Sequence, residues 1–245
     1  MSISRTLCVA EALFWIFCLV SLVYPETGIA APEDGVVSGF VAYGGVPPAP
    51  TPVAITKDRE VCGAAPIFDQ SLVVARDRGV ANVVVTLSTE HGPPLKPLPA
   101  MRFDQKGCQY IPHVLVFPAG STVLILNSDG ILHNIHTESV LNSVMDMAQP
   151  GFKKQIRVII QTPEVIKVTC DAHNWMEGWW YVTRTPYYAM SGTDGRYLIS
   201  GVPPGTYTLN FWQEKLGTHS QQVVTQPGTV TVANFTFRPS KAPGS

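Results

Sequence analysis

Short β-like runs rich in apolar residues, separated by turn-forming residues, are the feature that most limits the folds open to this chain. Residues 122–127 are an example: Val123, Ile125 and Asn127 point to one face of an extended strand, and two leucines point to the other. The sequence contains 20 glycines and 21 prolines, as is usual for a loop-rich β protein, and it lacks the long 3.6-residue period of an amphipathic helix. The pattern therefore predicts an all-β protein.

The length of the chain and the spacing of these runs predict its organisation. With 245 residues, of which 45% are hydrophobic, the chain can form one large or two small domains. Proline-rich connections are expected at 46–52 and 91–99, an irregular surface loop at 57–67, and a loop or short helix at 142–150. The expected strands are 35–45, 71–75, 79–88, 108–117, 122–127, 130–137, 153–160, 164–170 and 178–183.

Three side chains able to bind a soft metal follow one another at three-residue intervals after an apolar run. Cys170, His173 and Met176 offer a thiolate, an imidazole and a thioether. This combination is typical of copper held in a trigonal site with a long axial sulfur. A buried structural cysteine is the alternative interpretation of Cys170, but it does not explain the histidine and the methionine that follow.

Such a site needs a second histidine, and residues 127–135 provide one. His133 comes after the turn that ends the strand at 127, and His136 lies three residues further on. In an extended strand these two side chains face opposite sides, so only one points inward. Met145 and Met147 offer further sulfur atoms that could cover or bind the metal. Methionine also fills irregular cores, which is the alternative interpretation of these residues. The residues alone leave the choice of histidine and methionine open.

The spacing Asn-x5-His, followed by Cys-x2-His-x2-Met, resembles the cupredoxins, the type 1 blue copper proteins. The short interval from cysteine to methionine is similar to the plastocyanin and amicyanin branch, and the resemblance covers residues 112–182. It implies a Greek-key cupredoxin β-sandwich in which His133, Cys170 and His173 are equatorial ligands and Met176 is the axial ligand. Asn134 resembles the asparagine that ties the two ligand loops together. This chain departs from the family in an insertion-like stretch, 137–152.

The same resemblance implies a function. It predicts an exported protein with one type 1 copper centre that transfers single electrons and is not an enzyme. His173 is then the edge where electrons leave, and the partner is a redox protein such as a c-type cytochrome or a cell-envelope oxidoreductase. A copper enzyme with an open coordination position, using His136 or a methionine of the inserted stretch, is an alternative.

The C-terminal part of the sequence has its own pattern of turns and strands. Asp-Gly and Pro-Pro-Gly turns precede alternating runs at 196–199 and 206–209. This block resembles the carboxypeptidase regulatory-like, transthyretin-type β-sandwich, which predicts a second small sandwich. The resemblance also leaves a different function open, a carbohydrate- or surface-binding module with ancillary copper binding.

The domain boundaries follow from these two resemblances. We expect an N-terminal β segment at 31–99, a cupredoxin-like copper domain at 100–185 and the regulatory-like sandwich at 186–245. Two arrangements are open for the N-terminal segment. Residues 35–90 and 186–238 form one sandwich into which the copper domain is inserted, or the N-terminal strands add to the copper domain.

The cysteines indicate an oxidising compartment. Of the five, Cys8 and Cys18 lie in the N-terminal segment, and an odd number remains after them. The economical solution pairs Cys62 with Cys108 in a disulfide and leaves Cys170 as the metal thiolate. Three buried free thiols are the alternative, which is less favourable outside the cytosol.

Residues 1–30 predict a signal peptide. Arg5 precedes an apolar run at 7–24, and small residues precede Ala31, the expected first residue after cleavage. An uncleaved signal anchor is the rival interpretation, and it would be the chain's one membrane contact. We therefore expect a periplasmic or extracellular protein. Residues 31–245 contain as many acidic as basic residues, so neither nucleic acid nor an anionic membrane surface is an expected partner.

Four further side chains carry expectations about exposure. His113 is expected to face solvent. Trp175 is expected either to pack in the core, the commonest place for a tryptophan in a sandwich, or to form an apolar rim beside an exposed His173, where a redox partner docks. Because successive side chains of a strand alternate, at most one of Trp179 and Trp180 points inward.

Overall fold

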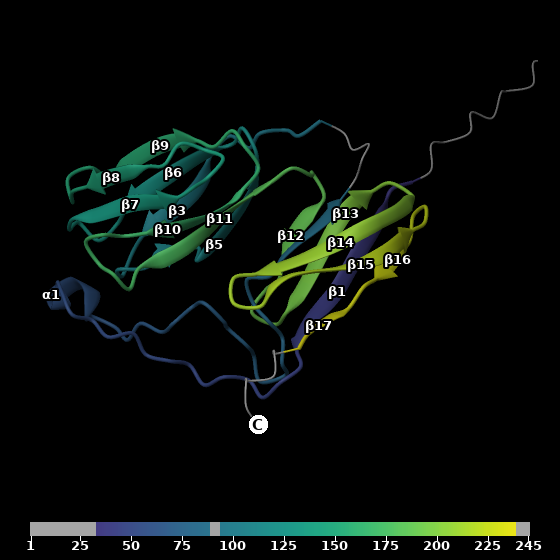
Figure 1. The fold of residues 1–245 in the computed structure, drawn as a ribbon, viewed down its shortest axis with the longest axis horizontal. Helices are drawn as coiled ribbons and strands as arrows, with labels where there is room; N and C mark the ends of the chain where they lie inside the picture. The colour runs from purple at the N-terminus through teal and green to yellow at the C-terminus, as the bar shows by residue number, and fades with distance from the viewer. Residues whose placement is uncertain (1–32, 89–93, 239–245) are drawn as a thin grey trace, which may run out of the picture. The chain divides into compact units, whose positions relative to one another are not determined.

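The computed structural model describes residues 33–88 and 94–238. Within these ranges nearly all regular structure is β-strand, arranged in four sheets (Figure 1), so the all-β prediction is confirmed. The expected signal peptide, with Cys8 and Cys18, lies outside the described residues. Among the described residues, no helix is both long enough and apolar enough to cross a membrane.

Two of the sheets form the first sandwich. Its core contains fully buried residues from both sheets, among them Phe103, Ile125 and Trp180. One sheet has the order β4 (Tyr110–Ile111), β3 (Met101–Gln105), β6 (Thr122–Asn127) and β9 (Gln155–Ile159). The other has the order β5 (Val114–Pro118), β11 (Glu177–Thr183), β10 (Val165–Thr169), β7 (His133–Glu138) and β8 (Asp146–Gln149). Burial alternates along β6 as predicted, and of the tryptophan pair Trp180 is the one that points into the core.

The other two sheets form the second sandwich, whose strands come from both ends of the chain. One sheet has the order β13 (Arg196–Val202), β1 (Gly35–Tyr43) and β16 (Val230–Val232), and β17 (Phe235–Phe237) also pairs with β1. The other has the order β12 (Tyr188–Met190), β2 (Val84–Ser88), β14 (Gly205–Gln213) and β15 (Gly217–Thr225). Figure 1 shows β1, in purple, among the green and yellow C-terminal strands. The pairing thus follows the first of the two expected arrangements.

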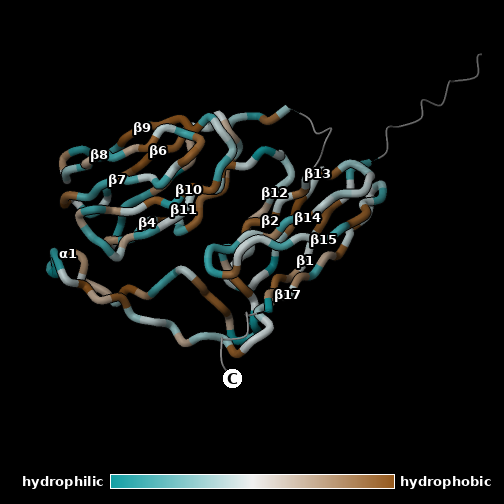
Figure 2. The backbone as a smooth tube through the Cα atoms, in the orientation of Figure 1, coloured by the Kyte–Doolittle hydropathy of each residue, from teal (hydrophilic) through white to brown (hydrophobic). Residues whose placement is uncertain are grey.

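Hydrophobic segments recur along the strands of both sandwiches (Figure 2). The second core includes Val37 and Val41 of β1 together with Leu209 and Phe211 of β14. Burial of these side chains is what joins the N-terminal strands to the C-terminal ones, since apolar burial is the main favourable contribution to folding.

Some expected strands differ in the structure. The run 108–117 is divided into β4 and β5 around Pro112, whose nitrogen cannot donate a ladder hydrogen bond. Residues 71–75 and 79–83 form isolated bridges instead of strands, Val74 with Val80 and Gly79 with Ala42. The expected loop or short helix at 142–150 contains β8, because these residues pair antiparallel with β7. β3, which pairs parallel with β6, was not among the strands expected from the sequence.

A proline-rich segment, residues 46–67, runs beside the first sandwich, and we call it the strap. It was expected to be irregular, and its one regular element is the short helix α1 (Arg59–Cys62). Val53, Ile55 and Val61 of the strap pack against the first core. A disulfide joins Cys62 of the strap to Cys108, which is the pairing expected from the sequence.

The two sandwiches contact each other through a small apolar cluster and a buried polar group. Val84 and Trp212 of the second sandwich meet Val114 of the first. Glu214, after β14, accepts a hydrogen bond from Trp179 Nε1 at 2.8 Å and pairs with His113 Nε2. The prediction that His113 faces solvent is therefore wrong, because this ring is buried against Glu214.

Candidate metal centre

His133, Cys170 and His173 meet at one end of the first sandwich. His133 begins β7, and Cys170 follows the end of β10. The two strands are antiparallel neighbours, with Thr169 opposite His136, so these ends lie side by side. A tight loop after Cys170 turns His173 back toward it: the Met176 amide donates to the His173 carbonyl, and the Cys170 amide donates to the Met176 carbonyl.

The spacing of the three metal-binding atoms fits a metal ion. His133 Nδ1 lies 3.1 Å from His173 Nδ1, and Cys170 Sγ lies 4.0 and 3.8 Å from these two nitrogens. A point equidistant from all three lies about 2.1 Å from each, close to the lengths of roughly 2.0–2.1 Å and 2.3 Å known for zinc bonds to imidazole and thiolate. Two nitrogens and a thiolate around one point, with a thioether nearby, form the set that suits copper.

The outward-facing nitrogens of both imidazoles contact carboxylates. His133 Nε2 lies 2.9 Å from Asp129 Oδ2, and His173 Nε2 lies 2.8 Å from Asp58 Oδ2. Burial alone lowers the pKa of His133, but the hydrogen bond to Asp129 and the neighbouring Cys170 outweigh it and raise this pKa to about 9. Burial lowers the pKa of His173, and Asp58 opposes that shift only in part.

Polar contacts around Cys170 support a thiolate. The backbone N–H of Asn134 donates to Cys170 Sγ at 3.3 Å, so Asn134 does join the two ligand segments, through its main chain. The buried Tyr110 hydroxyl donates to the carbonyls of Asn134 and Thr169 at 2.7 and 2.9 Å, which links β7 to β10 beside the sulfur. Burial raises the pKa of Tyr110, so this hydroxyl keeps its proton.

Met176 lies in the same buried cluster as Cys170. Met145 and Met147 pack against that cluster from β8 and the turn before it, half-buried. The structure therefore gathers the four residues expected as ligands, three of them around one point and the fourth in the adjoining core.

The edge of His173 differs from the expectation. Its side chain is 0% exposed, because Asp58 of the strap covers the outward-facing nitrogen. Trp175 packs on the His173 ring, with ring centroids 5.1 Å apart, and donates its indole N–H to the Cys108 carbonyl at 3.2 Å. The predicted exposed His173 edge with an apolar tryptophan rim is therefore wrong: the strap, which the family resemblance does not include, lies over it.

His136 lies on the opposite side of β7 from His133, as strand alternation predicts. Its side chain is 39% exposed, and its Nδ1 lies 3.1 Å from Asp171 Oδ1. Asp146, across the β7–β8 ladder, completes a solvent-facing group of three. The structure thus places His133 with Cys170, and His136 outside that group.

The sequence analysis missed both carboxylates that touch the imidazoles. Asp129 lies four residues before His133, within the segment that was singled out for His133. A carboxylate at this spacing, across a turn, was the one sequence feature that could have indicated the contact. Asp58 precedes His173 by 115 positions, and nothing in the local sequence connects the two.

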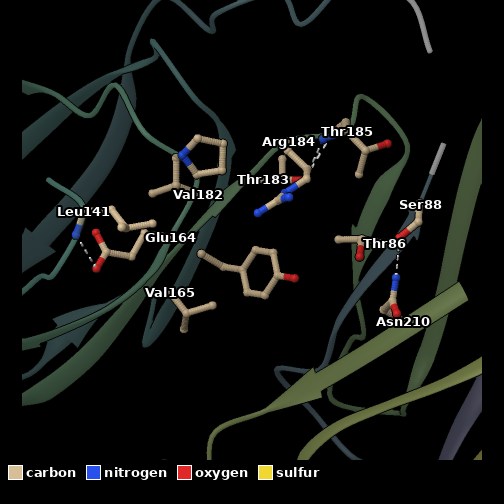
Figure 3. Close-up of a pocket in the computed structure, with 12 residues that line it drawn as sticks. Thr86, Ser88, Leu141, Glu164, Val165, Val182, Thr183, Arg184, Thr185 and Asn210 are labelled. Atoms are coloured by element: carbon tan, nitrogen blue, oxygen red, sulfur yellow. Dashed lines mark hydrogen bonds between the residues drawn. The ribbon is translucent and has the colours of Figure 1, made fainter. Parts of the chain in front are cut away.

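A hollow between the sandwiches lies away from this centre. Figure 3 shows its walls. On one side Glu164 accepts a hydrogen bond from the Leu141 amide, and on the other Asn210 donates a hydrogen bond to Ser88 Oγ. Thr86, Tyr181 and Arg184 also line it. The hollow contains no cluster of metal-binding or nucleophilic side chains among the residues that line it.

Comparisons with known proteins give structural matches alone. No protein-family model matches the sequence, and no curated protein does. Matching solved structures include a purple cupredoxin from Nitrosopumilus maritimus, with 22% identity, TM-score 0.29, and coverage of 34% of this chain and 98% of that one.

An amicyanin variant matches with 18% identity and TM-score 0.32, covering 40% of this chain and 98% of its own. A copper-containing nitrite reductase from Thermus scotoductus SA-01 matches with 23% identity and TM-score 0.31, over 40% of this chain and 25% of its own. At these identities and TM-scores the matches say nothing of function, which must be argued from the residues of the centre.

Proposed function

We propose that this chain binds one copper ion as a type 1 centre and transfers single electrons. His133, Cys170 and His173 would hold the metal, with Met176 as the axial ligand. The observation that carries the proposal is the convergence of two imidazole nitrogens and one thiolate on a single point, at bonding distance from all three.

The residues of the centre suit electron transfer because they leave little room for movement. When bound, copper supplies a one-electron couple between Cu(II) and Cu(I). Each imidazole lies between a carboxylate and the Cys170 sulfur, and the Asn134 backbone amide donates a hydrogen bond to that sulfur. Rigid, hydrogen-bonded surroundings of this kind orient the ligands and tune the metal.

Burial of the ligands supports a carrier over an enzyme. His133 and His173 are 0% exposed, and Cys170 and Met176 are 2% exposed. A substrate that binds directly to the metal needs an open position, and these side chains surround the point with protein atoms. A redox protein such as a c-type cytochrome remains the partner we propose, reached by electron transfer through the protein.

The disulfide supports a location outside the cytosol. Cys62 and Cys108 are bonded, and such bonds persist in the periplasm and outside the cell. The likeness of the second sandwich to the carboxypeptidase regulatory-like family, and glycan binding by it, stay predictions.

Cys170→Ser tests the proposed function. The protein loaded with Cu(II) and dialysed should have an intense blue absorption band and narrow copper hyperfine splitting in its EPR spectrum, because both come from a copper–thiolate bond. Cys170→Ser should lose both and keep the fold, while the control His136→Ala, on the outer side of β7, should keep both. A colourless parent protein, or an unchanged spectrum in Cys170→Ser, contradicts the proposal.

A further inference from the structure

In both imidazoles of the centre, Nε2 contacts a carboxylate, while Nδ1 faces the other imidazole and the Cys170 sulfur. An ionised carboxylate accepts hydrogen bonds and cannot donate them. The Nε2 atoms of His133 and His173, in contact with Asp129 and Asp58, must therefore carry a proton. Nδ1 is then the nitrogen of each ring that is left to bind a metal, and the two Nδ1 atoms face each other and the Cys170 sulfur, which is the orientation that a metal requires.

Asp129 is held by the backbone of the turn at Gly107 and Cys108. The amides of these two residues donate to Asp129 Oδ1 and Oδ2 at 2.6 and 2.9 Å. Their positive φ values, 62° and 54°, turn successive N–H groups toward the same carboxylate. The side chain of Asp129 is 6% exposed, and two backbone hydrogen bonds fix it in addition to its contact with His133.

Asp58 reaches His173 from the strap, outside the part of the chain that carries the cupredoxin pattern. It immediately precedes α1, where an aspartate ordinarily caps the helix with its side chain. Here the side chain makes no capping bond, and the main-chain carbonyl accepts from the Val61 and Cys62 amides instead. The residue has φ 47°, an uncommon conformation that aspartate tolerates better than most residues.

The Cys62–Cys108 disulfide joins the supports of the two carboxylates. Cys108 belongs to the turn that holds Asp129, and Cys62 ends the helix that Asp58 begins. The Lys57 ammonium adds a contact of 3.4 Å to the Ala172 carbonyl, beside His173. One cross-linked unit therefore supplies an acceptor to each imidazole.

We propose that Asp58 and Asp129 are paired positioning residues, which hold both imidazoles with Nδ1 aimed at the metal and add negative charge behind them. The inference rests on the proposed copper function. Carboxylates that accept from ligand imidazoles fix the tautomer and raise ligand basicity, and their loss costs about 10- to 100-fold in metal affinity. Negative charge at this place also favours the more positive, oxidised ion, so its removal raises the reduction potential.

Asp58→Ala is the decisive variant, since Asp58 lies on the strap and contributes no side chain to either core. In metal-free protein labelled with ¹⁵N-histidine, the parent should show His173 with the proton on Nε2 and not on Nδ1. Asp58→Ala should give a mixture of both tautomers, and its copper affinity, measured by competition with a chelator, should fall about 10- to 100-fold. Asp58→Glu should restore most of the affinity, because it restores an acceptor.

Asp171→Ala is the matched control. It removes the same charge one residue from Cys170, but its carboxylate contacts the exposed His136 and neither ligand imidazole. Its tautomers and its copper affinity should equal those of the parent. Asp129→Ala should resemble Asp58→Ala in its loss of copper affinity, provided that its melting temperature shows the turn at 107–108 still folded.

The results separate this inference from the proposed function. If Asp58→Ala and Asp171→Ala give the same tautomers and affinity, the positioning role is overturned while a blue parent protein still supports the copper centre. If the parent takes up no copper at Cys170, the proposed function fails, and the tautomer spectra of the metal-free protein still decide whether Asp58 orients His173.

Discussion

His173 is covered by Asp58 on one side and Trp175 on another, so under the proposed function its ring edge would not be the place where electrons enter or leave. A partner cannot touch the ring while the strap is in place. Asp171 is an exposed group next to the centre, bonded directly to Cys170 along the chain and paired with His136. We therefore expect substitutions around His136 to affect partner binding more than substitutions near Trp175.

Tyr110 gives a second test at the scale of single residues. Its hydroxyl joins the Asn134 and Thr169 carbonyls of β7 and β10, which carry His133 and Cys170. Tyr110→Phe leaves two buried carbonyls with one partner fewer and should lower the free energy of unfolding by about 1–3 kcal/mol. Denaturant unfolding of the metal-free protein measures the change. A stability equal to that of the parent would show that water replaces the hydroxyl.

The residue types and their spacing predict most of the centre, and the reason is local. Cys170, His173 and Met176 share one short loop, so their order in the sequence is nearly their order in space. Strand alternation indicated that only one of His133 and His136 points inward, but the choice of His133 came from its position in the family resemblance and not from the residues alone. Asp58 could not be predicted, since its contact depends on the path of the strap and on a disulfide rather than on any periodic pattern.

At the scale of elements, Glu164 organises the turn between β7 and β8. It accepts hydrogen bonds from Ser139 and from backbone amides of the turn, in part as Figure 3 shows. Burial raises the pKa of the Glu164 carboxyl, but these bonds outweigh burial and lower it from 4.5 to about 2. A carboxyl with a depressed pKa contributes stability above its unfolded value, and this contribution is lost as the pH falls toward 2.

Glu164→Gln should therefore destabilise the protein by about 1–2 kcal/mol at pH 7, the cost of weakening charge-assisted bonds. The difference from the parent should shrink as the pH falls from 4.5 toward 2. Melting temperatures across this range provide the measurement, with Glu138→Gln, an exposed carboxylate in β7, as the control. A difference that stays constant with pH would contradict the role given to the carboxylate.

Elements with clean alternation, such as β6, could be predicted to the residue, because one buried face and one partly exposed face leave a period of two. β8 could not, since Asp146–Gln149 has two exposed positions and is a strand only through its ladder with β7. β3 was missed for a similar reason, because its place between β4 and β6 depends on tertiary pairing and not on a local sequence pattern.

At the scale of the whole molecule, the buried carboxylate Glu214 joins the two sandwiches. It accepts from Trp179 Nε1 and pairs with His113, both in or beside the first sandwich, while its own position follows β14 of the second. Glu214→Ala leaves those groups buried without a partner and should lower the free energy of unfolding by about 3–5 kcal/mol. Glu214→Gln keeps an acceptor and should cost less.

Calorimetry of the parent and both variants provides the measurement. We expect the alanine variant to melt lowest, with the first sandwich and the second unfolding in separate transitions because their shared polar contact is lost. Equal melting temperatures in all three proteins would mean that the apolar cluster of Val84, Val114 and Trp212 alone holds the sandwiches together.

The pairing of β1 with β16 and β17 has a consequence for how the chain reaches its fold. The Phe40 amide donates to Asn234 Oδ1, 194 positions later, so the first strand finds its neighbours only when nearly the whole chain is present. Contacts of such separation must overcome a large loop-closure entropy, and proteins rich in them fold slowly. During synthesis the second sandwich cannot close until its last strands have been made, whereas the first has all its strands by Thr183. The first sandwich is thus free to fold before the sandwich that encloses it in sequence.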